Sequence, residues 1–127
     1  MRIGLLKERK PDERRVALTP DQAEALVAEG HEVLVEHEAG AASRFPDEEY
    51  AHAGVTLSGR DTVYEDCELL LKVKCPLPDE YEYLRSGHVL FAYLHFDENL
   101  PPAEIEKIVA TGVTGIAYEW VEENGAL

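Results

Sequence analysis

Cysteine is scarce in this sequence, and the two cysteines present are badly placed to form a bridge. Cys67 and Cys75 flank one predicted strand, and eight residues of strand span roughly 26 Å. Cα atoms joined by a disulfide lie within about 7 Å of each other, so a disulfide between these cysteines is excluded. The sequence also lacks a CxxC pair, and we therefore expect no metal site built on thiolates.

Long apolar segments are also missing. The longest uninterrupted apolar run covers residues 89–94, whereas a helix that crosses a bilayer needs about 20 apolar residues. The apolar run at residues 3–6 is far shorter than the central part of a secretory signal peptide. With neither a membrane span nor a targeting signal, the sequence indicates a cytoplasmic protein.

Basic residues are few: the chain carries 12 lysines and arginines against 26 aspartates and glutamates, a formal net charge of −14. Such acidity argues against nucleic acid and anionic membranes as partners, because phosphate binding needs a basic face. Six of the 12 basic residues lie in the first 15 positions beside three acids, so that segment is net +3 and the other 112 residues are net −17. This basic start is compatible with an anion site and with an ordinary surface loop.

The sequence lacks the common nucleotide-binding and hydrolase motifs. The dinucleotide fingerprint GxGxxG occurs nowhere, and Gly40 in "EAGAAS" follows a predicted strand without the rest of that pattern. The chain also contains no P-loop, no GxSxG and no HExxH. These residues therefore carry no recognisable apparatus for binding a nucleotide.

Short apolar runs alternate with helical patterns along the whole chain. We predict strands at 2–6, 31–36, 68–74, 88–94 and 113–119, with a brief extended piece at 55–57, and helices at 19–30, 45–54, 77–87 and 101–112. The first helix has the clearest start, since Thr19 is a good N-cap, Pro20 suits the first helical position and Gln22 completes a capping box. This alternation is typical of βαβ units.

Three of the strands are continuously apolar, which indicates strands covered on both faces. Strands that alternate with helices in this way form a parallel sheet. We predict a single α/β domain over residues 1–127, with a parallel sheet flanked by helices, flavodoxin-like or Rossmann-like but without the dinucleotide fingerprint.

Charged residues are expected to converge at one edge of this sheet. In parallel folds the loops that follow the strands open at the carboxyl edge, where ligands bind. Arg14 and Arg15 follow the first strand, Lys74 ends the strand at 68–74, and His95 comes directly after the strand at 88–94. Cations and an imidazole there would suit a small carboxylate, with the histidine as proton donor or acceptor. The spacing alone leaves a solvated strand edge equally possible.

Other polar residues near these strand ends receive a structural interpretation. We expect Lys72 to be a solvated strand-end residue that points to the other face from Lys74. His37 also follows a strand and competes with His95 for the acid/base role. The remaining candidates are expected to be structural, supporting or surface residues: His31, His52, His88, Tyr118, Glu119 and Cys75.

Three stretches carry a resemblance to a known family. The segments "ERRVALTP", "LLLKVKCP" and "LFAYLH" occur in the order and spacing of the N-terminal domain of alanine dehydrogenases and the related transhydrogenase α-subunits, and the resemblance covers essentially the whole chain. It implies that Arg15 and Lys74 hold the substrate's carboxylate and carbonyl, and that His95 serves as acid/base. The sequence departs from the family at Cys75, where glutamate is common, and at the bulky, acidic residues 96–98.

The resemblance implies the substrate-binding N-terminal domain of an NAD-dependent amino-acid dehydrogenase. L-Alanine, NAD and water would give pyruvate, ammonia and NADH, with NAD bound mainly by a further domain that this chain does not contain. The chain alone is then expected to be inactive, and the full-length protein to be a homo-oligomer. A saccharopine-type lysine-forming dehydrogenase, a transhydrogenase α-subunit and a non-catalytic binding module remain as alternatives.

Overall fold

Six parallel strands form one sheet in the computed structural model, which describes residues 1–96 and 100–126. The strands lie in the order β3-β2-β1-β4-β5-β6. Their bounds are β1 (Arg2–Leu5), β2 (Glu32–Glu36), β3 (Thr56–Ser58), β4 (Leu69–Lys74), β5 (Val89–Tyr93) and β6 (Thr114–Ala117). The order reverses between β1 and β4, which is the Rossmann arrangement rather than the flavodoxin one. The predicted parallel α/β fold is therefore confirmed.

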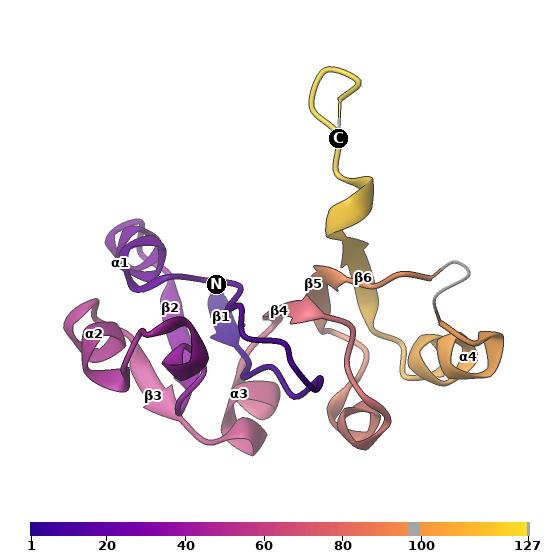
Figure 1. Ribbon diagram of the computed structural model, residues 1–127, viewed down its shortest axis with the longest axis horizontal. Helices are drawn as coiled ribbons and strands as arrows, with labels where there is room; N and C mark the ends of the chain where they lie inside the picture. Colours follow the sequence, from indigo (N-terminus) through magenta and orange to yellow (C-terminus); the bar gives the residue numbers. More distant parts are fainter. Residues whose placement is uncertain (97–99, 127) are drawn as a thin grey trace.

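Helices cover the two faces of the sheet unequally (Figure 1). α1 (Pro20–Ala28) and α2 (Asp47–His52) pack on β2 and β3, whereas α3 (Arg60–Asp66), the 3₁₀ helix η2 (Pro78–Tyr83) and α4 (Pro102–Ala110) pack together on the opposite face. The 3₁₀ helices η1 (Ala41–Ser43) and η3 (Tyr118–Trp120) are short. On the α1 side, β5 is contacted by the short helix η3, whose Tyr118 ring lies 4.1 Å from that of Phe91.

Two apolar cores follow from the alternation of side chains along the strands. Leu70 and Leu90 are buried on the α3 side with Val63 and Ile108, while Leu71, the next residue of β4, is buried on the α1 side. β4 is thus covered on both faces over most of its length, as its continuous apolar run predicts.

The first helix begins as its sequence predicts. The backbone N–H of Gln22 donates to the Thr19 hydroxyl at 3.4 Å, and the Gln22 side chain accepts from the Thr19 N–H at 3.0 Å. Pro20 occupies the first helical position. This capping box satisfies two backbone donors that the helix itself cannot pair.

Three elements differ from the sequence prediction. α3 was not expected, because its seven residues show no apolar stripe beyond Val63 and Tyr64. The helix expected at 77–87 is the shorter 3₁₀ helix η2, which ends at Tyr83 before the extended residue Leu84. The last strand ends at Ala117, so that Tyr118 and Glu119 belong to η3.

Two kinds of site are not found among the described residues. None of their helices is long and apolar enough to cross a membrane. They also contain no group of three or more potential metal-ligating side chains placed to hold an ion. Of the acidic stretch after His95, residues 97 and 98 lie outside the described ranges, and only Phe96 is described.

Gly4 in β1 sets how closely α3 approaches the sheet. A Cβ atom at this position would lie 2.6 Å from Val63 Cγ1 and 3.0 Å from Cys67 Cβ. We expect Gly4→Ala to lower the free energy of unfolding by about 1–3 kcal/mol, the usual cost of overpacking a core. Urea denaturation followed by circular dichroism measures the difference.

Gly59→Ser is the matched control for this substitution. Gly59 is the N-cap of α3, has an ordinary extended backbone, and a Cβ atom there meets nothing within 4 Å. Serine is a preferred N-cap residue, so stability should be unchanged or slightly higher. Equal losses in the two variants would contradict the proposed packing role of Gly4.

Candidate functional site

Lys74 and His95 lie at the ends of neighbouring strands, at the carboxyl edge of the sheet. β4 and β5 are adjacent and parallel, with Lys74 beside Tyr93 in register, and His95 follows Tyr93 by two residues. Both side chains line one pocket of about 290 Å³, together with Lys10, Cys75, Tyr81 and other residues. The sequence thus predicts the position of this pair correctly.

Tyr93 connects the candidate residues, and sequence reasoning missed it. Its ring stacks on the imidazole of His95 with a centroid distance of 5.7 Å, and the Lys74 ammonium lies 5.6 Å from its centre. Tyr118 meets the same ring edge-on at 5.2 Å. The signal in the sequence was the spacing, because a strand residue two positions before His95 faces the same way as the expected site.

Arg15 lines a second, wider hollow rather than the pocket of Lys74 and His95. This hollow has a volume of about 670 Å³ and lies over β4 and β5 on the α1 side of the sheet, beside η3. Tyr93 and Tyr118 form part of its wall. Since Tyr93 also touches Lys74 and His95, the pocket and the hollow adjoin at this aromatic ring.

Glu13 holds the guanidinium of Arg15. Arg15 Nε and Nη2 donate to its two carboxylate oxygens at 3.0 and 2.7 Å, and the Arg15 backbone N–H donates at 3.0 Å. This pairing lowers the pKa of Glu13 to about 2 and raises the pKa of Arg15. Glu13 takes two of the five N–H donors of a guanidinium, which leaves others for a carboxylate ligand. Arg15 is 60% exposed.

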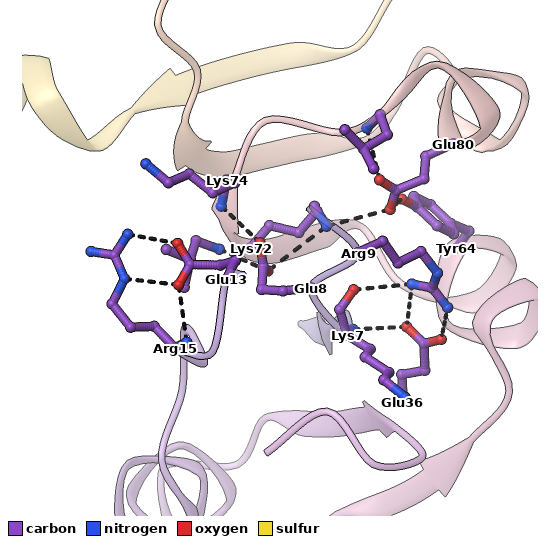
Figure 2. Close-up of polar contacts among 12 residues, drawn as sticks. Lys7, Glu8, Arg9, Glu13, Arg15, Glu36, Tyr64, Lys72, Lys74 and Glu80 are labelled. Carbon is purple, nitrogen blue, oxygen red and sulfur yellow. Dashed lines mark hydrogen bonds and ion pairs between the residues drawn. The ribbon is translucent and has the colours of Figure 1, made fainter. Parts of the chain in front are cut away.

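Lys72 is buried, and the expectation that it is a solvated strand-end residue is wrong. Its side chain is 1% exposed, and its ammonium lies 3.3 Å from a carboxylate oxygen of Glu80 and 3.7 Å from one of Glu8. The face of β4 on which it lies is covered by η2 and α3, and the charge is neutralised there by buried acids. Figure 2 shows Lys72 pointing between these two carboxylates.

Lys72 and Lys74 do point apart, as expected (Figure 2), but regular strand alternation does not explain it. Residues two positions apart in a strand face the same side. The register between β4 and β5 shifts by one residue between Leu71 and Lys74, so that Leu71 pairs with Phe91 and Lys74 with Tyr93. This bulge turns Lys74 toward Tyr93.

Both buried carboxylates have further partners. Glu8 accepts the backbone N–H groups of Val73 and Lys74 at 3.0 and 2.9 Å. Glu80 accepts the N–H of Leu77 at 2.8 Å and the hydroxyl of Tyr64 at 3.1 Å. Burial and the Glu80 carboxylate raise the pKa of the Tyr64 phenol. Nothing in the acidic sequence distinguishes these two glutamates from the exposed ones.

Most of the basic start of the chain is engaged in ion pairs. Arg2 pairs with Glu32 at 2.9 Å, Lys7 with Glu38 at 3.3 Å, and Arg9 with the buried Glu36. Lys7 and Arg9 hold the first loop to β2 and to the turn after it, whereas Arg2 joins the start of β1 to the start of β2. The cluster of basic residues at the start of the chain is therefore explained by ion pairs with acids close in space more than by a broad anion-binding site.

His95 has an unusual backbone and a defined partner. Its φ is +52°, in the left-handed region that non-glycine residues seldom adopt. The His95 backbone N–H donates to Glu119 at 2.6 Å. Glu119 thus supports this turn, which agrees with the supporting role expected of it.

His88 and His37 lie apart from this chemistry, whereas Cys75 lines the pocket but is not activated for it. His88 is buried, its Nε2 lies 2.7 Å from the Tyr64 carbonyl, and burial lowers its pKa. His37 is exposed beside Asp47 and lines neither the pocket of Lys74 and His95 nor the hollow of Arg15. Burial raises the pKa of the Cys75 thiol to about 11, so this cysteine is not an activated thiolate.

Comparison with known sequences gives one consistent family. The model described as "Alanine dehydrogenase/PNT, N-terminal domain" matches residues 4–127. The alanine dehydrogenase of Bacillus subtilis is 46% identical over 127 residues, which cover 100% of this chain and 33% of that protein. The alanine dehydrogenase of Geobacillus stearothermophilus is 47% identical over 133 residues, which cover 100% of this chain and 34% of that protein.

Solved structures agree with the sequence relatives. An L-alanine dehydrogenase structure superposes with a TM-score of 0.93 at 37% identity, covering 100% of this chain and 35% of that one. A transhydrogenase from Sinorhizobium meliloti superposes with a TM-score of 0.87 at 31% identity, covering 97% and 36%. The chain thus spans about a third of the length of the relatives that it matches.

The buried ammonium of Lys72 leads to a stability prediction. Lys72→Ala leaves two buried carboxylates without their counter-ion, and breaking such a pair costs about 3–5 kcal/mol. Lys74→Ala, two positions away and partly exposed, should cost about 1 kcal/mol or less. Urea unfolding of both variants measures the difference, and similar losses would show that Lys72 is not the counter-ion.

The Glu13–Arg15 pair predicts a dependence of stability on pH. Because the folded-state pKa of Glu13 lies near 2, below the ordinary 4.5, its contribution is complete above about pH 5 and is lost as the pH falls toward 2. Glu13→Gln should therefore destabilise the chain most near neutral pH, and the loss should shrink below about pH 4.5. Urea unfolding across this range, with the exposed Glu82→Gln as baseline, tests it. A loss that does not change with pH would contradict the ion pair.

Proposed function

Since the chain belongs to the alanine dehydrogenase/PNT N-terminal domain family, we propose that it forms the substrate-binding part of an NAD-dependent amino-acid dehydrogenase. The full-length protein, a homo-oligomer in this proposal, oxidises L-alanine with NAD and water to pyruvate, ammonia and NADH. The observation that carries the proposal is the pairing of Lys74 and His95 in one pocket.

Each of the three residues has a role suited to its chemistry. Arg15 binds the substrate carboxylate through guanidinium donors that Glu13 does not use. Lys74 stabilises negative charge on the carbonyl oxygen of the 2-oxo acid, and on the same oxygen of the water adduct of the imine that precedes it. His95 takes a proton from the water that adds to the imine, and returns it when ammonia leaves.

The residues of this chain do not fit the cofactor itself. In Rossmann folds a dinucleotide lies where the strand order reverses, against a glycine-rich turn and a helix N-terminus. Here that position, between β1 and β4, holds the buried Glu8 carboxylate, and a long loop separates Leu5 from α1. A carboxylate there would repel a pyrophosphate. NAD, which accepts the hydride, is therefore assigned to a domain outside this chain.

A transhydrogenase subunit is the second candidate, favoured by the likeness to a transhydrogenase structure. Lys74 and His95 count against it, because exchange of hydride between two nucleotides needs no acid/base pair for a substrate. A saccharopine-type dehydrogenase differs in its substrate instead. Assays of the full-length protein with L-alanine, with saccharopine, and for hydride exchange between nucleotides separate these enzymes, and a non-catalytic module would be inactive in all three.

Substitutions in the full-length protein test the assigned roles. His95→Ala should lower kcat by roughly 10²–10⁴-fold, the usual contribution of one acid/base group. Arg15→Ala should mainly raise KM, because a carboxylate clamp holds ground state and transition state alike. Steady-state kinetics with L-alanine as varied substrate give both values.

His37→Ala is the matched control for His95. His37 also follows a strand, but it is exposed and lines neither the pocket nor the hollow. Its replacement should leave kcat and KM near the wild-type values. A folded His95→Ala protein with normal kcat would refute the acid/base assignment.

A further inference from the structure

Glu8 takes the place of a strand where β1 ends. The last backbone hydrogen bond between β1 and its neighbour β4 runs from the Leu6 N–H to the Leu71 carbonyl at 3.2 Å. Beyond it, the Glu8 side chain accepts the next donors of β4, with Oε2 at 3.0 Å from the Val73 nitrogen and Oε1 at 2.9 Å from the Lys74 nitrogen. The side chain is 4% exposed, so water does not compete for these donors.

These two donors belong to consecutive residues, which is the mark of an irregular strand. In a regular strand, successive N–H groups point to opposite edges and cannot meet one carboxylate. The shift of register lies at this place, between Leu71 and Lys74. Glu8 therefore binds the backbone conformation that the bulge creates and that a straight β4 would not offer.

The ammonium of Lys72 makes a carboxylate tenable at this buried position. Lys72 lies 3.7 Å from Glu8 and 3.3 Å from Glu80. A charged acceptor forms shorter and stronger hydrogen bonds than a neutral one, so the ion pair strengthens the hold of Glu8 on β4. Lys72 thus acts on Lys74 through Glu8 and the backbone, although its side chain points away.

We propose that Glu8 is a positioning residue, which clamps the bulge in β4 and so aims the side chain of Lys74 at the substrate. This rests on the proposed function. Without the bulge, Lys74 would face the same side as Lys72; with it, Lys74 lies beside Tyr93 and reaches the pocket of His95. Glu8 lines neither the pocket of Lys74 and His95 nor the hollow of Arg15, so it does not touch the substrate and acts on the reaction by holding the backbone of Lys74.

Glu80 provides a matched control within the same network. It also binds Lys72, and it also accepts a backbone N–H, but from Leu77 in the following loop. Glu80→Gln therefore removes the same charge beside the same lysine and leaves the donors of Val73 and Lys74 with Glu8. Both substitutions are expected to lower stability, and only Glu8→Gln to disturb Lys74.

The kinetic test is a double-mutant cycle in the full-length enzyme. Glu8→Gln should lower kcat by about 10- to 100-fold, the effect of misplacing a catalytic group by a small distance. In a Lys74→Ala background the same change should alter kcat by less than about twofold, because the residue through which Glu8 acts is gone. A purely structural role predicts the same factor in both backgrounds, and that result would overturn the proposal. Glu80→Gln should retain most of the activity.

An NMR test on this chain is independent of the enzymatic reaction. Amide proton signals of Val73 and Lys74 should move upfield in Glu8→Gln, since an amide is a weaker acceptor than a carboxylate, and the Leu77 signal should move in Glu80→Gln. Unchanged Val73 and Lys74 signals in Glu8→Gln would overturn the proposal. If the wild-type enzyme does not oxidise alanine, the proposed function fails while this test still decides whether Glu8 clamps β4. If Glu8→Gln does not fold, Glu8→Asp replaces it with the same criteria.

Discussion

One buried ammonium, that of Lys72, organises the carboxyl edge of this sheet. It links Glu8 in the loop after β1 to Glu80 in η2, with β4 between them. Each carboxylate also binds backbone N–H groups, so the charges fix where three separate segments lie relative to one another. Apolar burial is non-directional, whereas a buried charge that loses its partner is strongly penalised.

The sheet divides into a covered half and an open half. α1 and α2 cover β2 and β3, while the same face over β4 and β5 forms the hollow that Arg15 and Tyr93 line. The covered half supplies stability. The open half presents the guanidinium of Arg15 beside the rings of Tyr93 and Tyr118. The pocket of Lys74 and His95 adjoins it at Tyr93, and together the two offer the cations and the imidazole that the proposed substrate requires.

Much of the fold could be predicted because its signals are local. The capping box at Thr19 needs only neighbouring residues, and the apolar runs identify strands buried on both faces. The proximity of Lys74 and His95 also follows from sequence, because both come at the ends of strands that prove to be adjacent. The roles of these residues were implied by family resemblance rather than by spacing.

The features that sequence did not reveal depend on distant parts of the chain. Lys72 is buried because two acids enclose its ammonium. Glu80 in η2 lies eight residues further along the chain, and Glu8 lies far back, in the loop after β1. The partner of Arg15 is nearby, yet in a chain with 26 acids nothing marks Glu13 as the one that pairs. A bulge leaves no composition signal at all, so the direction of Lys74 follows only from the register with β5.

The burial of Lys72 also makes its ion pairs insensitive to the salt concentration of the solvent. Counter-ions screen exposed charges over about 8 Å at physiological ionic strength but reach buried pairs much less. Added salt would therefore weaken exposed pairs such as Arg2–Glu32 and relieve repulsion among the many surface acids. The ion pairs of Lys72 with Glu8 and Glu80 would hardly respond, so the geometry around Lys74 should stay constant between dilute buffer and concentrated salt.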